Sequence, residues 1–127
     1  MYKELIICAV VIITIITINW FLQDYTKNSV TEISNKLKEL EEDLKEKDKE
    51  KVQLKLEEIK NTWSEEYKVL AAFIEHDELE KVETSLVELE AFIEVEDFDM
   101  GTNEVNKSIF VLKHIAEKYD FSLVNVF

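Results

Sequence analysis

The chain has 127 residues, with one Gly, no Pro and one Cys. A β-sandwich or barrel needs turn residues roughly every 8–12 positions, so this composition excludes both. The apolar share of 46% is that of a globular chain and argues against disorder. A single Cys excludes an internal disulfide and a Cys-cluster metal site. What remains is a helical protein.

The charge is strongly acidic: 28 Asp and Glu stand against 15 Lys, without any Arg, and the net charge is −13. Nucleic-acid binding needs a basic surface and draws on Arg for phosphate and guanine contacts. Anionic lipid headgroups repel such a chain as well. We therefore expect no nucleic-acid binding and no charge-driven binding to a membrane surface.

Residues 5–22 read LIICAVVIITIITINWFL, a run of 18 positions without a charge. As a helix this run is about 27 Å long, enough to cross the hydrocarbon core of a bilayer. Thr14 and Thr17 can return their hydroxyl groups to carbonyls of the preceding turn. Trp20 and Tyr25 are aromatic residues of the kind that favours the headgroup level. The run predicts an N-terminal transmembrane anchor over residues 1–24.

A cleaved signal peptide is the competing interpretation of this run. It is weaker because no Ala-x-Ala site follows and long side chains begin at once. Cys8 is placed too early for a lipoprotein and is most simply an apolar lining residue. Only four residues precede the run, and a short tail favours an extracytoplasmic C-terminal domain. We expect a single-pass protein of the cell membrane.

After this run the apolar residues return at intervals of three and four, the pattern of helices with one buried face. The first stripe continues the run without a breaker, which predicts one helix from about Tyr2 to about Glu46. The charged stretch Lys45–Lys51 ends it, and Asp48 is placed to cap the next helix. The four stripes comprise Val30, Ile33, Leu37, Leu40 and Leu44; Val52, Leu56, Ile59, Trp63, Leu70, Phe73 and Ile74; Leu79, Val82, Leu86, Leu89 and Ile93; and Val105, Ile109, Leu112, Ile115 and Ala116.

Two further junctions separate the helices. His76–Asp77 interrupts the second stripe, and Asp77 with Glu80 has the spacing of a capping box. Glu96–Thr102, which contains the only Gly, predicts the longest loop. The fourth helix is expected to end near Lys118.

The chain also repeats itself at an offset of 49 residues, and each unit is a helix, an acidic turn and a second helix. This predicts an all-α fold in which an N-terminal transmembrane helix runs into an acidic four-helix bundle, residues 25–127. The bundle is made of two αα-hairpins, about residues 25–75 and 77–127. A parallel coiled-coil dimer through the first stripe is the alternative. The matched pairs are Ile33/Val82, Leu37/Leu86, Leu40/Leu89, Leu44/Ile93, Asp48/Asp97, Glu39/Glu88 and Glu41/Glu90.

This connectivity places particular residues at one end of the bundle. If the first helix rises from the membrane, the second and fourth return toward it, so His76 and His114 should lie on the membrane-proximal side. The apolar tail FSLVNVF (residues 121–127) begins there as well. We expect the tail either to pack against the junction of the second and third helices or to contact a membrane partner.

Patterns for catalysis or metal binding are weak. His76 with Glu78, and His114 with Glu117, are the pairs that resemble metal ligands, but the apolar faces hold no Glu that would complete such a site. One Gly cannot build a P-loop, a nucleophile elbow or a dinucleotide fingerprint. We expect no enzyme activity, no cofactor and no metal.

Two further residues stand out for structural reasons. Trp63, at the centre of the second helix, is the largest candidate core anchor. Ser85, at the middle of the third helix, is expected to face the core and to bond to the preceding turn. It has no nearby base in the sequence that would suggest catalysis.

The chain resembles the bacterial domain-of-unknown-function family 4363, most specifically in the stretches His76–Leu89 and Leu112–Phe127. The resemblance implies a short single-span helical protein of the kind found in clostridia and their relatives. It also implies a multi-span membrane partner of the YetF type, and it supplies no reaction. Asp99–Thr102 departs from the family pattern and suggests a longer third loop. The residues that match are Trp63, His76, Glu78, Leu79, Ser85, Leu86, Leu89, His114, Ile115, Glu117, Leu123, Asn125 and Phe127.

Taken together, the sequence predicts a non-enzymatic, membrane-anchored interaction or accessory module that faces the extracytoplasmic space. Its partner would be a membrane protein or a second copy. The main alternative is a sensor that binds a small ligand between its helices. A sensor needs polar groups inside the bundle, and the apolar stripes offer almost none. A metal-dependent enzyme would require both histidines to converge with carboxylates.

Overall fold

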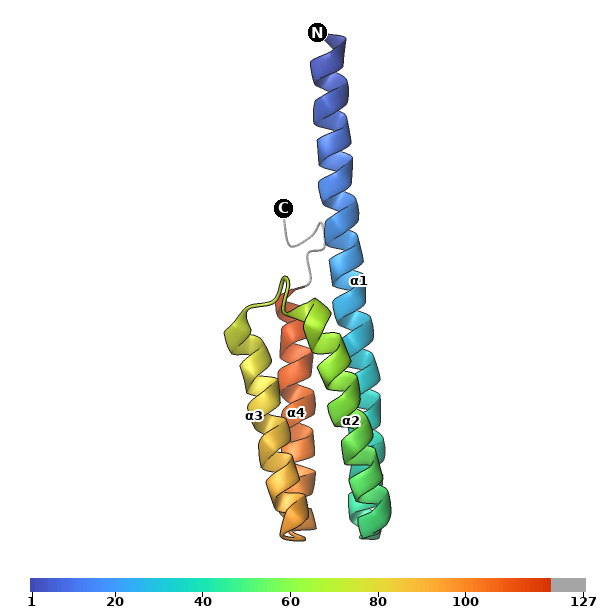
Figure 1. Ribbon diagram of the computed structural model, residues 1–127, viewed down its shortest axis with the longest axis vertical. Coiled ribbons are helices and arrows are strands. Elements are labelled where there is room, and N and C mark those ends of the chain that lie inside the picture. The colour runs from blue at the N-terminus through green and yellow to red at the C-terminus, as the bar shows by residue number, and fades with distance from the viewer. Residues whose placement is uncertain (120–127) are drawn as a thin grey trace.

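Residues 1–119 are described by the computed structural model and form four helices: α1 (Tyr2–Glu46), α2 (Lys49–Leu70), α3 (His76–Glu94) and α4 (Phe98–Lys118). Successive helices run in opposite directions and pack side by side, and α1 extends far beyond the other three (Figure 1). Within residues 1–119 there is no strand. The predicted all-α bundle with a long N-terminal apolar helix is confirmed.

α1 is continuous over 45 residues. It contains neither Gly nor Pro, so nothing in its sequence interrupts the backbone hydrogen bonds. Residues 1–21 are exposed, whereas a buried stripe begins at Thr26. The hydroxyl groups of Thr14 and Thr17 donate to the carbonyls of Val10 and Ile13, each at 2.8 Å, as predicted. In the described part of the chain, α1 is the one helix long and apolar enough to cross a membrane, by length and composition.

The core lies between α1 and α4 and extends under α2 and α3. α1 packs against α2 and α4, and α4 packs against α1 and α3, whereas α2 and α3 contact each other least. The stripe of α1 is thus covered within one chain, and a parallel coiled coil through it would require α2 and α4 to leave. Side chains without any exposed surface are Ile33, Leu37, Leu40, Val52, Ile59, Val82, Leu89 and Val105.

The turns of the two hairpins have the same conformation. Lys47 and Glu96, 49 positions apart, both adopt the left-handed region, with φ of 57° and 59°. The residue after each, Asp48 and Asp97, caps the next helix by accepting a hydrogen bond from the backbone N–H three residues on, at 3.3 and 3.2 Å. Lys49 Nζ lies 2.6 Å from Glu96 Oε1 and joins the two turns. The repeat read from the sequence therefore extends to the backbone.

The expected long loop at Glu96–Thr102 is wrong. Asp97 caps the helix directly after α3, so α4 begins at Phe98 and Gly101 lies inside it. Gly101 is buried, and a Cβ at this position would lie 3.6 Å from Leu44 Cδ2 of α1. The Gly marks a close approach of α1 and α4 rather than a turn.

The connection between α2 and α3 also differs from the prediction. α2 ends at Leu70, so Ile74 is buried from within the connection rather than from a helix. Asp77 does not cap α3, because the helix begins one residue earlier with Glu75 in the N-cap position and no side-chain cap. The backbone N–H of Glu75 instead donates to Tyr119 Oη, 2.9 Å away, just beyond α4. A tertiary contact has replaced the local capping box.

Gly101→Ala should stabilise the protein by roughly 0.5–1 kcal/mol, because Gly is less favourable than Ala inside a helix by about this amount. The added methyl group would be in ordinary van der Waals contact with Leu44. Thermal unfolding of the full chain in detergent measures the change. Asn106→Ala, at an exposed position of α4, is the control for a general gain in helix propensity. A midpoint below that of the wild type would show that the α1–α4 contact leaves no room for a methyl group.

Candidate functional site

The residues singled out from the sequence divide into buried and exposed groups. Trp63, Glu78 and Ser85 are buried, with exposed fractions of 6%, 5% and 1%. His76, His114 and Glu117 are exposed. The remaining three, Leu123, Asn125 and Phe127, and with them the predicted packing of the tail, lie outside the described residues.

Ser85 belongs to a buried polar cluster between α3 and α4. Its hydroxyl group donates to Glu104 Oε1 at 2.9 Å and contacts Ser108 Oγ at 2.5 Å. The expected bond from Ser85 to its own preceding turn is wrong; Ser108 makes such a bond, donating to the Glu104 carbonyl at 2.9 Å. All three side chains are buried. They form one closed network inside the second hairpin.

The protons in this network can be counted. Three contacts join the groups, yet the two serine hydroxyl groups carry two protons. An ionised Glu104 leaves one contact without a proton, whereas a protonated Glu104 gives every contact its own. Burial raises the pKa of Glu104, and the neighbouring Glu88 carboxylate acts in the same direction. The proton count and burial both act toward the neutral acid, whereas Lys107 Nζ, 3.6 Å from Glu104 Oε1, favours the ionised form.

The first hairpin has a different polar layer at the equivalent positions. Glu104 corresponds, 49 residues back, to Lys55, whose Nζ lies 2.7 Å from Glu39 Oε2 and 3.2 Å from Glu58 Oε2. In the second hairpin Lys107 Nζ lies 3.2 Å from Glu88 Oε2 instead, at the rim of the cluster. The two hairpins thus share a backbone conformation but differ in polarity. The first has the ion pairs of Lys55 at the position where the second has the buried Glu104.

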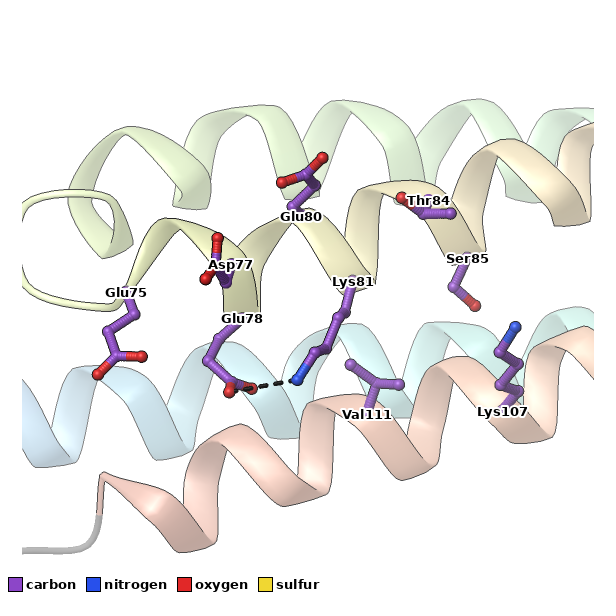
Figure 2. Close-up of a pocket in the computed structure, with 9 residues that line it drawn as sticks. All are labelled: Glu75, Asp77, Glu78, Glu80, Lys81, Thr84, Ser85, Lys107 and Val111. Carbon is purple, nitrogen blue, oxygen red and sulfur yellow. Dashed lines mark hydrogen bonds and ion pairs between the residues drawn. The ribbon is translucent and has the colours of Figure 1, made fainter.

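A groove of about 660 Å³ opens between α3 and α4 beside the buried cluster. Glu78, Lys81 and Ser85 point from α3 toward α4, and Lys107 and Val111 face them from α4 (Figure 2). The groove therefore presents carboxylates, two ammonium groups and a hydroxyl group along one side of the bundle. Ser85 is almost fully buried, with an exposed fraction of 1%, so its hydroxyl group lies at the base of this lining.

Glu78 is the most deeply buried charge in that groove. Its Oε1 lies 3.1 Å from Lys118 Nζ and 3.4 Å from Lys81 Nζ, and its Oε2 is buried without a hydrogen-bond partner among residues 1–119. The hydrogen bond from Lys118 is the main reason that the pKa of Glu78 lies below its usual range. The ion pairs tie the first turn of α3 to the end of α4.

The same region forms the exit end of the bundle, the end at which residues 5–22 of α1 emerge (Figure 1). Tyr119 joins α4 to the α2–α3 connection through Glu75, and Lys118 Nζ lies 3.4 Å from Glu75 Oε2. His76 and His114 belong to segments at this end, as the connectivity predicted. A cavity of about 220 Å³ lies against α1 here, lined by Asn19, Leu22, Gln23, Thr26, Phe73 and Tyr119.

A second perturbed carboxyl group lies between α1 and α2. Burial, together with the neighbouring Glu32 carboxylate, raises the pKa of Glu66 to about 8. Glu66 Oε2 is buried and has no hydrogen-bond partner in the described part of the chain. Burial and the Glu32 carboxylate thus both favour the protonated form of Glu66, while the nearby Lys36 ammonium group acts in the opposite direction.

Buried acids are what the sequence reasoning missed. It held that the apolar faces contain no Glu, which is wrong for Glu78 and Glu104. The helical period was the available signal: Glu104, Ser108, Leu112 and Ile115 recur on one face of α4. No group of three His, Cys, Asp or Glu side chains that could hold a metal ion occurs within residues 1–119.

Family membership covers the bundle. Residues 20–126 match the family model described as a domain of unknown function, DUF4363, and the chain belongs to that family. The match begins at Trp20, so nearly all of the apolar run precedes it. No curated protein and no solved structure matches the chain significantly. The family description assigns no function, so the function is argued from the molecule.

Glu66→Gln should remove a loss of stability at alkaline pH. Because the folded-state pKa of Glu66 exceeds its ordinary value, its contribution to stability is complete below about pH 4.5 and is lost as the pH rises through about 8. The variant should match the wild type in thermal midpoint near pH 4 and exceed it by a growing margin as the pH rises to 9. Glu65→Gln, at an exposed neighbouring position, is the matched control. Parallel pH profiles for Glu66→Gln and the wild type would contradict the assignment.

Proposed function

We propose that this protein is a non-enzymatic, single-pass interaction or accessory module of the cell membrane. In this proposal residues 1–24 anchor the chain and residues 25–127 form an acidic helical bundle outside the cytoplasm. The partner is a neighbouring membrane protein, for which the family resemblance suggests the YetF type, or a second copy. The role is to hold that partner at a set distance from the bilayer.

The observation that carries this proposal is the unbroken helix α1. One helix supplies both an 18-residue exposed apolar run and the fully buried stripe from Ile33 to Leu40. An exposed apolar surface of this length is costly in water and favourable in a bilayer. Because the backbone does not bend at the junction, a span in the membrane fixes the height and direction of the bundle. A rigid stalk suits a scaffold better than a freely tethered domain.

A sensor is the second candidate, and the α3–α4 groove favours it. The groove has a small-molecule volume, about 660 Å³, and combines Lys81 and Lys107 with the buried Glu78 carboxylate. Such a lining would take a ligand that carries both an amino and an acidic group. The expected lack of polar groups inside the bundle, which counted against a sensor, is wrong.

Site-specific photocrosslinking in intact cells tests the interaction module. A photoreactive residue replaces one exposed apolar side chain on each outer helix in turn: Leu54 on α2, Val87 on α3 and Phe110 on α4. We expect a discrete crosslinked product in the membrane fraction from at least one face. Cells kept in the dark are the control, and added protease should digest the bundle from outside.

Three results would contradict the proposal. Recovery of the chain in the soluble fraction would show that residues 1–24 do not anchor it in the membrane. Protection of the bundle from external protease would show that the bundle lies in the cytoplasm. Absence of crosslinked products from all three helices would contradict the interaction role.

A further inference from the structure

A continuous groove runs between α2 and α3, the pair of neighbouring helices with the least contact. One cavity, of about 270 Å³, lies beside Trp63, Leu86 and Val87. The next, of about 210 Å³, lies beside Leu56 and Ile93 and shares Glu90 with the first. From Gln53 to Trp63 the groove follows α2 for about three helical turns, or roughly 15 Å. The buried residues that line it are Leu56, Trp63, Leu86 and Ile93.

The rim of the groove is acidic. Four carboxylates line the two cavities, those of Glu57, Glu83, Glu90 and Glu94, against the single ammonium group of Lys60. Lys60 Nζ lies 3.0 Å from Glu90 Oε1, so the one cation bridges the groove where the cavities meet. Lys60 Nζ also lies 3.8 Å from Glu57 Oε1, so an occupant with positive charges would meet two rim carboxylates outside the Lys60 ion pairs, those of Glu83 and Glu94.

Two side chains in the groove would gain a contact from such an occupant: Val87 an apolar contact, and Trp63 a hydrogen-bond acceptor. Val87 is 66% exposed, although it stands next to the buried Leu86. The indole N–H of Trp63 is buried and has no acceptor in the described part of the chain. Trp63 packs edge-on against Tyr67, with ring centroids 6.0 Å apart, and this contact fixes the indole. A large apolar side chain would cover Val87, and a polar one could accept from Trp63.

We propose that the α2–α3 groove binds a basic amphipathic helix of a partner protein. Apolar side chains of that helix pack on Trp63, Leu86 and Val87, and its Lys or Arg side chains pair with the rim carboxylates. Charge selects this occupant over a second copy, which would bring a further −13 toward an acidic rim. The inference rests on the proposed interaction module and names the surface and the chemistry of its partner.

The Lys60–Glu90 bridge gives the proposal a specific consequence. Removing the Lys60 charge makes the rim more acidic and frees Glu90, so Lys60→Gln should bind a basic helix more tightly. Removing rim carboxylates should weaken binding. Both effects are expected from substitutions in the same groove. General attraction between a basic peptide and an acidic protein would instead predict weaker binding whenever a carboxylate is removed, at any face of the bundle.

The test is a titration of the full chain in phosphatidylcholine nanodiscs with an amphipathic helical peptide of Leu, Ala and Lys. A Trp20→Phe background leaves Trp63 as the one tryptophan, so its emission reports on the groove. Val87→Glu tests the apolar contact, with Leu54→Glu as the matched exposed control on α2. Glu83→Gln with Glu94→Gln tests the rim, with Glu42→Gln and Glu117→Gln as the matched charge control. Peptide bound to lipid alone is common to every variant and cancels.

We expect Val87→Glu to weaken binding by about tenfold or more and Leu54→Glu to leave it within about twofold. The rim pair should weaken binding more than its charge control, Lys60→Gln should strengthen it, and a Glu-for-Lys peptide should not shift Trp63 emission. Equal affinities for Val87→Glu and Leu54→Glu, or equal effects of the two charge pairs, would overturn the proposal. So would tighter self-association than peptide binding, which would identify a second copy as the occupant.

Failure here is distinguishable from failure of the interaction module. Crosslinking from Leu54 or Phe110 with none from Val87 would support the interaction module but contradict the α2–α3 groove as its binding surface. Absence of crosslinks from all three helices would remove both.

Discussion

The structure depends on the burial of one stripe of α1. Ile33, Leu37 and Leu40 have no exposed surface, and they are covered by α2 on one side and α4 on the other. α2 and α4 are thereby both held to α1. Because the stripe continues a helix that begins at Tyr2, packing in the bundle also fixes the direction in which the apolar run leaves it. Burial of this one stripe therefore both stabilises the bundle and sets the placement of the proposed span.

The second hairpin repeats the first in backbone but differs from it in polarity. The left-handed residues, the Asp caps and the apolar stripes recur at an offset of 49. At the mid-helix positions, however, Lys55 is exposed enough to pair with two acids at the surface, whereas Glu104 is buried with Ser85 and Ser108. Paired charges at a surface contribute little to stability, while a satisfied buried network specifies one arrangement of helices. The α3–α4 pairing is therefore the more specific of the two.

The stripes predicted the helices because apolar spacing reports directly on burial. The limits of α1 and the caps at Asp48 and Asp97 follow from local sequence, and so does the end of α4 near Lys118. The α2–α3 connection did not follow, because Glu75 is satisfied by Tyr119, 44 residues away. Gly101 was assigned to a loop, although it lies inside α4 and is buried against Leu44 of α1, a tertiary contact that no local pattern records.

The candidate sites were less predictable than the fold. Trp63 and Ser85 were placed in the core from their helical positions. The partner of Ser85 comes from another helix, and the indole N–H of Trp63 has no acceptor within residues 1–119. Glu66 and Glu104 were overlooked because charge was taken to mean exposure. Burial raises the pKa of both carboxyl groups, which makes their protonated forms easier to accommodate between helices. The two grooves could not be predicted from the sequence, because they depend on how tightly neighbouring helices pack in the assembled bundle.

The central claim is that α1 passes from the apolar run into the bundle as one rigid helix. Amide hydrogen exchange of the full chain in phosphatidylcholine nanodiscs tests it at residues 22–30, the junction between exposed and buried parts. The account predicts that amides from Leu22 to Val30 exchange as slowly as those from Ile33 to Leu40. Fast exchange confined to the junction would reveal a hinge, and the bundle would then be a tethered domain rather than a rigid extension of the span.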